Sequence, residues 1–199
     1  DEVEWVQGGV NEPGRKEMGK GKLPEGISYR TVADKSLTDM LLDGELDAVI
    51  SARPPTVFLS GDGRLQRLMP NYREQELDYF ERTGIYPIMH TLAIRRDVYE
   101  ENRWIAGNLM TAFEEAKKNM VERLSDFNVS RIPMPWMQDR YAQAKEQFFP
   151  DTDYWPYGIE GSRKTLEAFL QFCDEQGVTR RKLTPEELFV PETQTSFKI

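Results

Sequence analysis

The sequence predicts an α/β protein with more helix than strand. Three observations indicate this class: apolar residues recur every three or four positions along several stretches, short apolar or alternating runs lie between those stretches, and glycine and proline separate the two kinds. Strands that alternate with helices are typical of α/β domains. With 199 residues, the chain is long enough to bury a core as one large domain or two small lobes.

A strand and then a loop are predicted at the start of the chain. Residues Val3–Val6 alternate in polarity, and Gly8-Gly9 then favours a turn. Residues 11–24 contain two prolines, three glycines and a small basic run, which together predict a loop. The chain begins with a strand pattern and without Met, so we expect that an N-terminal portion of the protein is missing from it.

A helix that leads into a strand is predicted next. Residues Ser36–Asp39 resemble a capping box that starts a helix, and Asp43-Gly44 ends it. The near-continuous apolar run Leu46–Ser51 is typical of a buried strand in a parallel sheet. Pro54-Pro55 ends that strand, because proline cannot continue a central ladder. Arg53 therefore follows the carboxyl end of a predicted strand.

The second half of the chain predicts one long strand and then mainly helices. Ile88–Ile94 is the longest strand candidate, and a turn at Gly84–Pro87 precedes it. A helix is predicted from about Glu101 to Leu124, with an apolar face that we expect in the core. That face consists of Trp104, Ile105, Leu109, Phe113, Ala116, Met120 and Leu124. The other predicted helices lie within Asp62–Arg82, at Asp139–Phe149, at Lys164–Gln176 and after the capping box Thr184–Glu187.

The composition excludes several classes of function. The chain carries 26 Lys and Arg against 34 Asp and Glu, a net charge of −8, so it lacks the attraction to phosphate backbones that a nucleic-acid partner needs. One His excludes every all-protein metal site that needs two or three imidazoles, and a single Cys cannot form an internal disulfide and does not indicate a structural zinc site. No run approaches the roughly 20 apolar residues of a membrane span. We expect no metal site built on His or Cys, no nucleic-acid partner and no membrane span, and a metal bound through carboxylates and water stays open.

Two residues are the first candidates for chemistry. Arg53 follows a predicted parallel strand, the place where open α/β sheets bind ligands, and its planar guanidinium suits a carboxylate. His90 lies within a predicted strand, and a histidine side chain can accept and donate protons. Two other interpretations stay open at this point. Arg53 pairs with a surface acid, or His90 is a core residue that only hydrogen-bonds its neighbours.

Aromatic residues in loops are further candidates. Trp136 and Tyr157 lie in loops set by proline, from which a ring can stack on an aromatic ligand or fill the space beneath the loop. Cys173 falls on an apolar helix face, and we expect a buried, unreactive thiol. The residues alone thus predict an α/β protein with a candidate anion-binding cleft.

Several segments resemble known proteins. Residues 42–50 and the segment 90–99 with its following helix resemble parts of the type 2 periplasmic-binding-protein fold. Within that fold, the chain resembles the 4,5-dihydroxyphthalate decarboxylase family. The segments that carry this resemblance are Ser51–Pro55, Arg82–His90, Trp155–Glu160 and Glu186–Phe189, and Trp5–Gly9 fits the middle region of the family. Together they spread over nearly all of the chain.

The resemblance implies two α/β lobes with a ligand cleft between them. Residues 1–87 would belong mostly to the second lobe. Residues 88–199 would return to the first lobe and end in helices and a tail. Family members are longer, and their additional N-terminal part builds most of the first lobe. We therefore expect the cleft near the strand that crosses back between the lobes.

The resemblance also implies a reaction, the cofactor-free decarboxylation of 4,5-dihydroxyphthalate or a related aromatic carboxylate. The products would be protocatechuate and CO2, in the cytoplasm of a bacterium that degrades phthalate. On this interpretation Arg53 binds a carboxylate, His90 is the acid and base, and Ser51 donates a hydrogen bond nearby. Tyr86 and Trp136 would line the site. The partner would be a small anionic aromatic substrate, and a homo-oligomer stays open.

A binding protein of the same fold is the alternative. It would capture a small aromatic or sulfonated anion for an ABC transporter in the periplasm, without catalysis. A protein of this fold related to riboflavin or thiamine precursors is a third, weaker option. A secretion signal upstream of the present sequence would favour the binding protein, and its absence would favour the enzyme.

Overall fold

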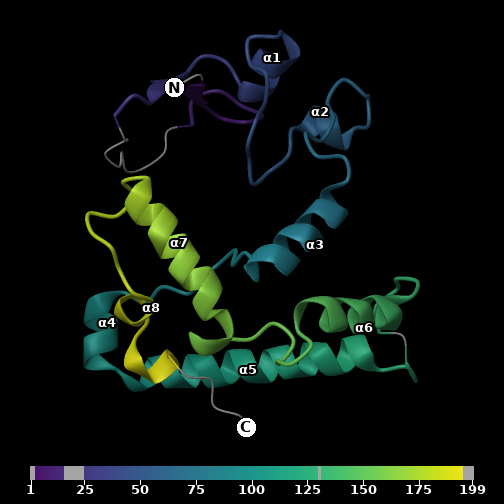
Figure 1. Ribbon diagram of the computed structural model, residues 1–199, viewed down its shortest axis with the longest axis vertical. Helices are drawn as coiled ribbons and strands as arrows, with labels where there is room; N and C mark the ends of the chain where they lie inside the picture. Colours follow the sequence, from purple (N-terminus) through teal and green to yellow (C-terminus); the bar gives the residue numbers. More distant parts are fainter. Residues whose placement is uncertain (1–2, 16–24, 130, 195–199) are drawn as a thin grey trace. The chain divides into compact units, whose positions relative to one another are not determined.

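The computed structural model describes residues 3–15, 25–129 and 131–194, which form two compact units (Figure 1). Unit 1 comprises Asp1–Glu76 with Glu175–Arg180, and unit 2 comprises Leu77–Asp174 with Arg181–Ile199. Helices make up most of the regular structure in the described residues. The type 2 periplasmic-binding-protein fold and the division of its lobes near residue 87 stay predictions.

Unit 1 contains a pair of parallel strands. Strand β1 (Glu4–Gln7) pairs with β2 (Ser28–Thr31), and Trp5 lies opposite Tyr29. The N–H of Val32 extends the ladder by donating to the carbonyl of Gln7 at 2.8 Å. The strand predicted at Val3–Val6 is thus confirmed, although it begins and ends one residue later than predicted. The loop predicted after it lies partly outside the described residues.

Helix α1 (Leu37–Leu42) begins and ends as its sequence predicts. Ser36 is the N-cap, and its hydroxyl accepts a hydrogen bond from the N–H of Asp39 at 3.0 Å. Gly44 follows the helix with a φ of +75°, a backbone conformation that glycine adopts at little cost. Leu37 and Met40 are buried and form the apolar core of unit 1.

The loop after β1 is bonded to the start of α1. The carbonyls of Gly9 and Val10 accept hydrogen bonds from the N–H groups of Leu37 and Thr38, at 2.9 and 3.0 Å. The buried Thr38 hydroxyl also donates to the Val10 carbonyl, at 2.5 Å. These bonds satisfy helix-start N–H groups that have no partner inside the helix. The parallel pair and α1 are therefore joined by the backbone of residues 8–10.

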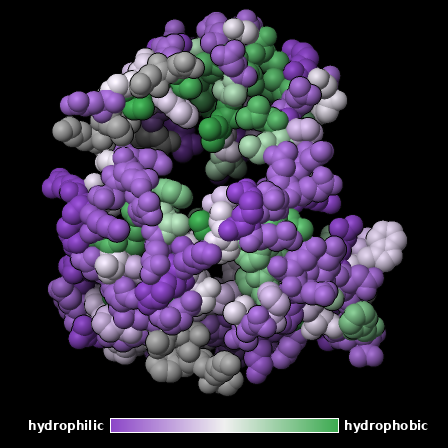
Figure 2. All heavy atoms as spheres, in the orientation of Figure 1, coloured by the Kyte–Doolittle hydropathy of each residue, from purple (hydrophilic) through white to green (hydrophobic). Residues whose placement is uncertain are grey.

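The predicted strands at Leu46–Ser51 and Ile88–Ile94 do not form. Neither run has sheet hydrogen bonds with another described segment. An apolar run becomes a strand only beside a second strand, because its backbone groups need partners. Ile50 is 84% exposed, and hydrophobic side chains gather on the surface over α1 and the segment that leads to α2 (Figure 2). Helices α2 (Thr56–Leu59) and α3 (Tyr72–Thr83) follow, the latter inside the region predicted to be loop and helix.

Unit 2 is helical in its described part. Its elements after α3 are α4 (Arg96–Glu101), α5 (Trp104–Ser125), α6 (Met137–Phe148), η1 (Glu160–Ser162), α7 (Arg163–Glu175), α8 (Pro185–Leu188) and η2 (Pro191–Thr193). Helix α5 contacts α6 and η2. The predicted long helix is confirmed as α5, preceded by the short α4, and the helices predicted near α6, α7 and α8 are confirmed as well. None of the described helices combines the length and apolar content that a membrane crossing requires.

The apolar stripe of α5 is not the core that its periodicity predicted. Trp104, Phe113 and Met120 are 63%, 45% and 43% exposed, and on α5 Ala106 is the buried residue. Periodicity shows that a helix has an apolar face, but another segment must cover that face. The described residues leave much of the α5 stripe open. On α7 the prediction holds, since Leu166, Leu170 and Cys173 are buried.

The backbone after β1 tolerates only glycine at one of its two glycine positions. A Cβ atom at Gly9 would lie 1.8 Å from the carbonyl oxygen of Glu12, whereas one at Gly8 would meet the flexible Leu37 side chain at 3.1 Å. We expect Gly9→Ala to lower the free energy of unfolding by about 1–3 kcal/mol, the scale of an overpacked site, and Gly8→Ala to lower it less. Urea unfolding of both variants tests this, and equal losses would contradict it.

Candidate functional site

The segment that carries Arg53 is a short loop held by its own side chains. The Ser51 hydroxyl accepts a hydrogen bond from the N–H of Arg53 at 3.1 Å and donates to the Arg53 carbonyl at 2.7 Å. Pro54-Pro55 then restricts the backbone further, because each ring fixes φ near −65°. The loop therefore holds its backbone in place while Arg53 itself is exposed. Its guanidinium makes no ion pair or hydrogen bond in the described part of the chain.

Asn11 joins this loop to the loop after β1. Its Nδ2 donates to the carbonyl of Pro54 at 3.5 Å, and its Oδ1 accepts the N–H of Thr56 at 2.8 Å. Asn11 follows the carboxyl end of β1 along the chain, so its bonds join the Arg53 loop to the segment that leaves the strand pair. Sequence reasoning missed Asn11. A polar residue after Gly-Gly was its only local sign.

Arg53 differs from Lys35 and Arg30, two other cations of unit 1, because those two are paired with carboxylates. Lys35 bonds to the carboxylates of Asp43 and Glu45, at 2.5 Å each, and these bonds raise the pKa of Lys35. Arg30 pairs with Glu4 at 2.8 Å. Within the described residues no carboxylate neutralises Arg53. A guanidinium without an acidic partner is the feature that anion binding needs, since it can form two parallel hydrogen bonds to one carboxylate.

The remaining predicted site residues lie in unit 2. His90 is exposed and lies in the extended segment between α3 and α4. In the described ranges no group of three His, Cys, Asp or Glu side chains is arranged as metal ligands. The structure therefore brings Ser51 and Arg53 together in unit 1 and places Tyr86, His90 and Trp136 in unit 2. A shared cleft for Arg53 and His90 stays a prediction.

Tyr86 belongs to a cluster of aromatic rings. Its ring centroid lies 5.3 to 5.5 Å from those of Phe148, Phe149 and Trp155, in tilted or edge-to-face geometry. The N–H of Tyr86 donates to the Thr165 hydroxyl at 3.0 Å, which fixes the segment before His90 against α7. This packing gives Tyr86 a part in the framework of unit 2. Its role as a lining residue stays a prediction.

Trp136 and Tyr157 differ in their surroundings. Trp136 precedes α6 with a φ of +57° and is 71% exposed, so it does not fill a space beneath its loop. A left-handed backbone is uncommon for any residue but glycine. The Tyr157 ring instead lies under the ammonium group of Lys117, 4.3 Å from the nitrogen. Burial and the charge of Glu114 raise the pKa of Tyr157.

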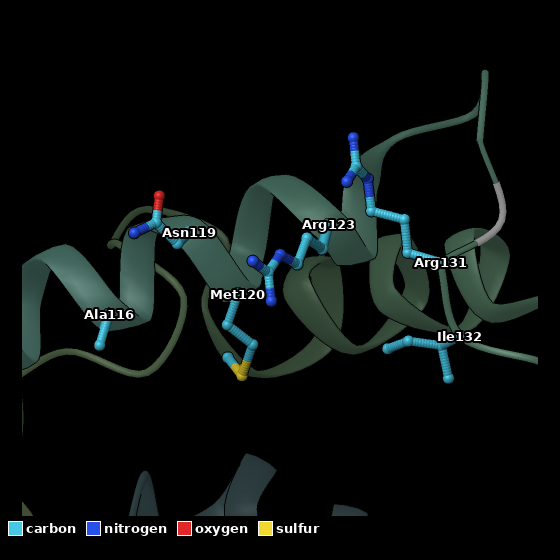
Figure 3. Close-up of a pocket in the computed structure, with 6 residues that line it drawn as sticks. All are labelled: Ala116, Asn119, Met120, Arg123, Arg131 and Ile132. Carbon is cyan, nitrogen blue, oxygen red and sulfur yellow. The ribbon is translucent and has the colours of Figure 1, made fainter.

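Two open hollows lie along α5. One, of about 530 Å³, lies between α5 and the segment before α6 (Figure 3) and is lined by Ala116, Asn119, Met120, Arg123, Arg131 and Ile132. The other, of about 440 Å³, shares two of those residues and contains Lys117, which pairs with Glu114 at 2.6 Å. Two arginines above an apolar floor suit an anion with an apolar body, but Arg131 already faces Asp126 at 3.9 Å. The Arg53 loop is the better candidate because its own hydrogen bonds hold its backbone and because it is one of the segments that resemble the decarboxylase family.

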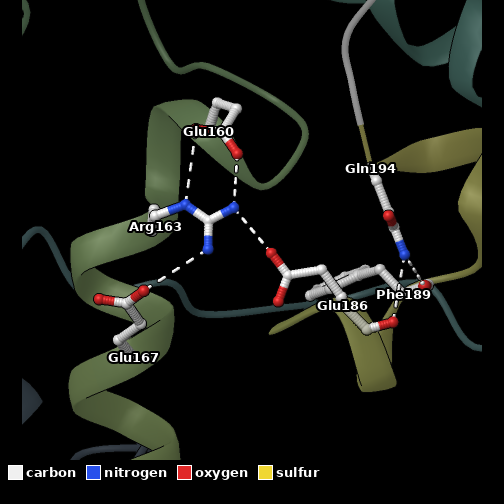
Figure 4. Close-up of polar contacts among 6 residues, drawn as sticks. All are labelled: Glu160, Arg163, Glu167, Glu186, Phe189 and Gln194. Atoms are coloured by element: carbon white, nitrogen blue, oxygen red, sulfur yellow. Dashed lines mark hydrogen bonds and ion pairs between the residues drawn. The ribbon is translucent and has the colours of Figure 1, made fainter. Parts of the chain in front are cut away.

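Arg163 connects two of the family-like segments (Figure 4). Its Nη2 lies 2.5 Å from Glu160 and 2.7 Å from Glu186, and its Nη1 lies 3.5 Å from Glu167. Gln194 adds hydrogen bonds from its Nε2 to the carbonyls of Glu186 and Phe189, at 3.1 and 2.9 Å. The segments Trp155–Glu160 and Glu186–Phe189 therefore meet at one guanidinium. Their place in this structure is to join α7 and α8.

Comparison with known proteins bears out the resemblance that these segments carry. Over all 199 residues the chain is 34% identical to a protein named 4,5-dihydroxyphthalate decarboxylase from Comamonas testosteroni, and it spans 60% of that protein's length. Over 76 residues, 38% of this chain, it is 38% identical to a protein of the same name from Pseudomonas putida, of which it covers 28%. No family model matches the chain.

The ion pairs of Arg163 with Glu160, Glu167 and Glu186 predict that the free energy of unfolding falls in acid. The guanidinium holds the pKa of Glu160 and Glu186 below their ordinary value of 4.5. A carboxylate whose pKa is lowered by folding stabilises the fold fully above its unfolded pKa, and this contribution disappears as the pH falls through the folded pKa. We expect Arg163→Met to lower the free energy of unfolding at pH 7 and to flatten its dependence on pH below about 4.5.

Unfolding by urea at pH values from 3 to 7 measures this dependence. Arg82→Met is the matched control, since it removes an exposed pair with a single partner, Asp78 at 2.9 Å, of the kind that contributes about 0.2–0.5 kcal/mol. An Arg163→Met variant with the same acid dependence as the natural protein would contradict the prediction.

Proposed function

This chain is a relative of the 4,5-dihydroxyphthalate decarboxylases along its whole length, and we propose on that basis that the intact protein decarboxylates 4,5-dihydroxyphthalate or a related aromatic carboxylate. The observation that carries the proposal is the exposed Arg53 guanidinium on its rigid loop, which has no acidic partner in the described residues. The chain spans 60% of the length of its relative from Comamonas testosteroni. The rest of such a protein would contribute further groups.

The chemistry of this decarboxylation requires the protein to perform three tasks. In 4,5-dihydroxyphthalate each hydroxyl group is para to a carboxylate. Removal of a phenolic proton directs electron density to the carbon that bears this carboxylate, and protonation of that carbon gives a dienone-like intermediate. Cleavage of the carbon–carboxylate bond then releases CO2 and restores the aromatic ring. The protein must therefore hold one carboxylate, accept the phenolic proton and supply a proton to carbon.

We assign the first task to Arg53. A bidentate guanidinium fixes the plane of a carboxylate as well as its position. The net charge of the chain is −8, so its overall field repels a dianion, and a local unpaired cation is needed to bind one. The Ser51 hydroxyl hydrogen is used within the loop, by the Arg53 carbonyl. In this proposal Ser51 keeps the loop in shape, and a hydrogen bond from it to substrate would require that bond to break.

We assign proton transfer to His90, the one imidazole in the sequence. A neutral imidazole nitrogen can accept the phenolic proton, and the protonated ring can then supply a proton to carbon, so one group can perform both transfers. The proposal includes the type 2 periplasmic-binding-protein fold, in which two lobes would close on the ligand and exclude water. Protocatechuate as product, a cofactor-free reaction and a place in phthalate breakdown also belong to the proposal.

Release of CO2 from 4,5-dihydroxyphthalate by the intact protein tests the activity. We expect turnover without an added cofactor. Stabilisation of the protein by this compound without turnover would contradict the enzyme and support a solute-binding protein instead.

Replacement of Arg53 tests the carboxylate-binding role. We expect Arg53→Ala to weaken the binding of 4,5-dihydroxyphthalate by about 1.5–3 kcal/mol, roughly ten- to 150-fold, the scale of a hydrogen bond to a charged group. Isothermal titration calorimetry measures this change. The matched control is Arg64→Ala, since Arg64 is an exposed arginine of the same unit that is paired with Asp62 at 2.7 Å. Equal affinities of Arg53→Ala and the natural protein would remove Arg53 from the site.

Replacement of His90 tests the proton transfer. We expect His90→Gln to abolish turnover and to keep much of the affinity, because glutamine retains a polar side chain but cannot carry the proton. Turnover and affinity are measured on the same preparation. A variant that turns over at the natural rate would return His90 to a structural role.

A further inference from the structure

We propose that Asn11 is a positioning residue, which sets the place of the Arg53 guanidinium by capping helix α2 from a distant part of the chain. This inference rests on the proposed function, because it gives Arg53 the task of binding substrate. Asn11 and Thr56 are 45 residues apart in sequence. The bond between them is therefore a tertiary contact, not a local turn.

Helix α2 begins without a side-chain cap from its own segment. Its N-cap is Pro55, which has no side chain able to accept a hydrogen bond from the helix. The first N–H of the helix, that of Thr56, is bonded instead to the Asn11 Oδ1 at 2.8 Å. Asn11 thus performs for α2 what a Ser, Asp or Asn N-cap performs locally in other helices.

The Asn11 amide also contacts Pro54 and the start of α1. Nδ2 of the same amide reaches the Pro54 carbonyl at 3.5 Å. The buried Thr38 hydroxyl lies 3.4 Å from the Asn11 Oδ1 and 2.5 Å from the Val10 carbonyl. The amide is therefore held against the start of α1 on one side and bonded to both sides of Pro55 on the other.

The Arg53 loop has few other hydrogen bonds that could fix its position in unit 1. The hydrogen bonds of Ser51 stay within residues 51–53, and Pro54-Pro55 has no N–H to donate. Between Ser51 and Thr56, the described hydrogen bonds that reach another part of unit 1 are the two made by Asn11. The bonds within the loop fix its conformation, and the bonds of Asn11 fix its position relative to the rest of unit 1. Without Asn11 the loop would keep its conformation but could shift, and the guanidinium would move away from the substrate carboxylate.

Binding of 4,5-dihydroxyphthalate to the intact protein, measured by calorimetry for single and double variants, tests this role. We expect Asn11→Ala to weaken binding about two- to thirtyfold, which corresponds to the range found for loss of a helix N-cap, since only the fraction of molecules with the loop in place binds well. In an Arg53→Ala background the same replacement should change affinity less than about twofold, because coupled residues are not additive. Thr31→Ala is the control, since it removes a contact of 3.4 Å to Gln7 in the same unit and touches no part of the Arg53 loop.

Thr56→Pro tests the same bond from its other end. Proline is favoured at the first position of a helix, and Pro55 before it has φ −51° and ψ 137°, which a following proline permits. This variant removes the donor without altering residues 8–11, so it decides the question if Asn11→Ala does not fold. We expect it to weaken binding in the same direction as Asn11→Ala.

The outcomes separate this inference from the function on which it rests. Absence of binding by the natural protein, or unchanged binding by Arg53→Ala, would contradict the proposed function and the role of Asn11 with it. A loss in Arg53→Ala with natural affinity in Asn11→Ala or Thr56→Pro would contradict the role of Asn11 alone. Equal losses from Asn11→Ala with and without Arg53 would show a structural effect and overturn the proposal.

Discussion

The hydrogen bonds of one loop, residues 8–11, hold unit 1 together. Its carbonyls accept the first N–H groups of α1, and its asparagine accepts the first N–H of α2. Two helix starts, each with unpaired donors, are therefore satisfied by a single segment that follows β1. The clash that a Cβ atom at position 9 would make with the carbonyl oxygen of Glu12 explains why this segment contains Gly9. The Arg53 loop takes its place from this arrangement.

Unit 2 depends on a different interaction, in which one guanidinium meets several carboxylates. Arg163 bonds to Glu160, Glu167 and Glu186, and so joins the turn before α7 to the start of α8. A single exposed ion pair contributes little to the free energy of unfolding. A guanidinium that bonds to three carboxylates forms a network, and this network fixes the two segments relative to each other. The two segments that it joins are among those that resemble the decarboxylase family. This part of the resemblance therefore reflects the framework of the protein, whereas Ser51–Pro55 contains the residue proposed to contact substrate.

Local patterns in the sequence predicted the helices well and the strands poorly. The Ser36 cap, the Gly44 stop and the Thr184–Glu187 capping box were predictable because each depends on neighbours in sequence. The runs at 46–51 and 88–94 were wrongly predicted as strands, because a strand depends on a partner that the pattern does not contain. Arg53 was chosen because it follows the run at 46–51, which does not form a strand, and because of its motif, so its role in the site stays a prediction. Asn11 was not predictable, since the loop residues that it bonds lie more than 40 residues away.

The central claim is that the carboxylate of an aromatic substrate is bound by the Arg53 guanidinium. A crystal structure of the intact protein with 4,5-dihydroxyphthalate tests this most directly. The account predicts a substrate carboxylate within about 2.7–3.0 Å of both terminal nitrogens of Arg53, in the bidentate geometry of such pairs. A bound ligand with its carboxylates on other residues, and Arg53 in contact with water alone, would contradict it.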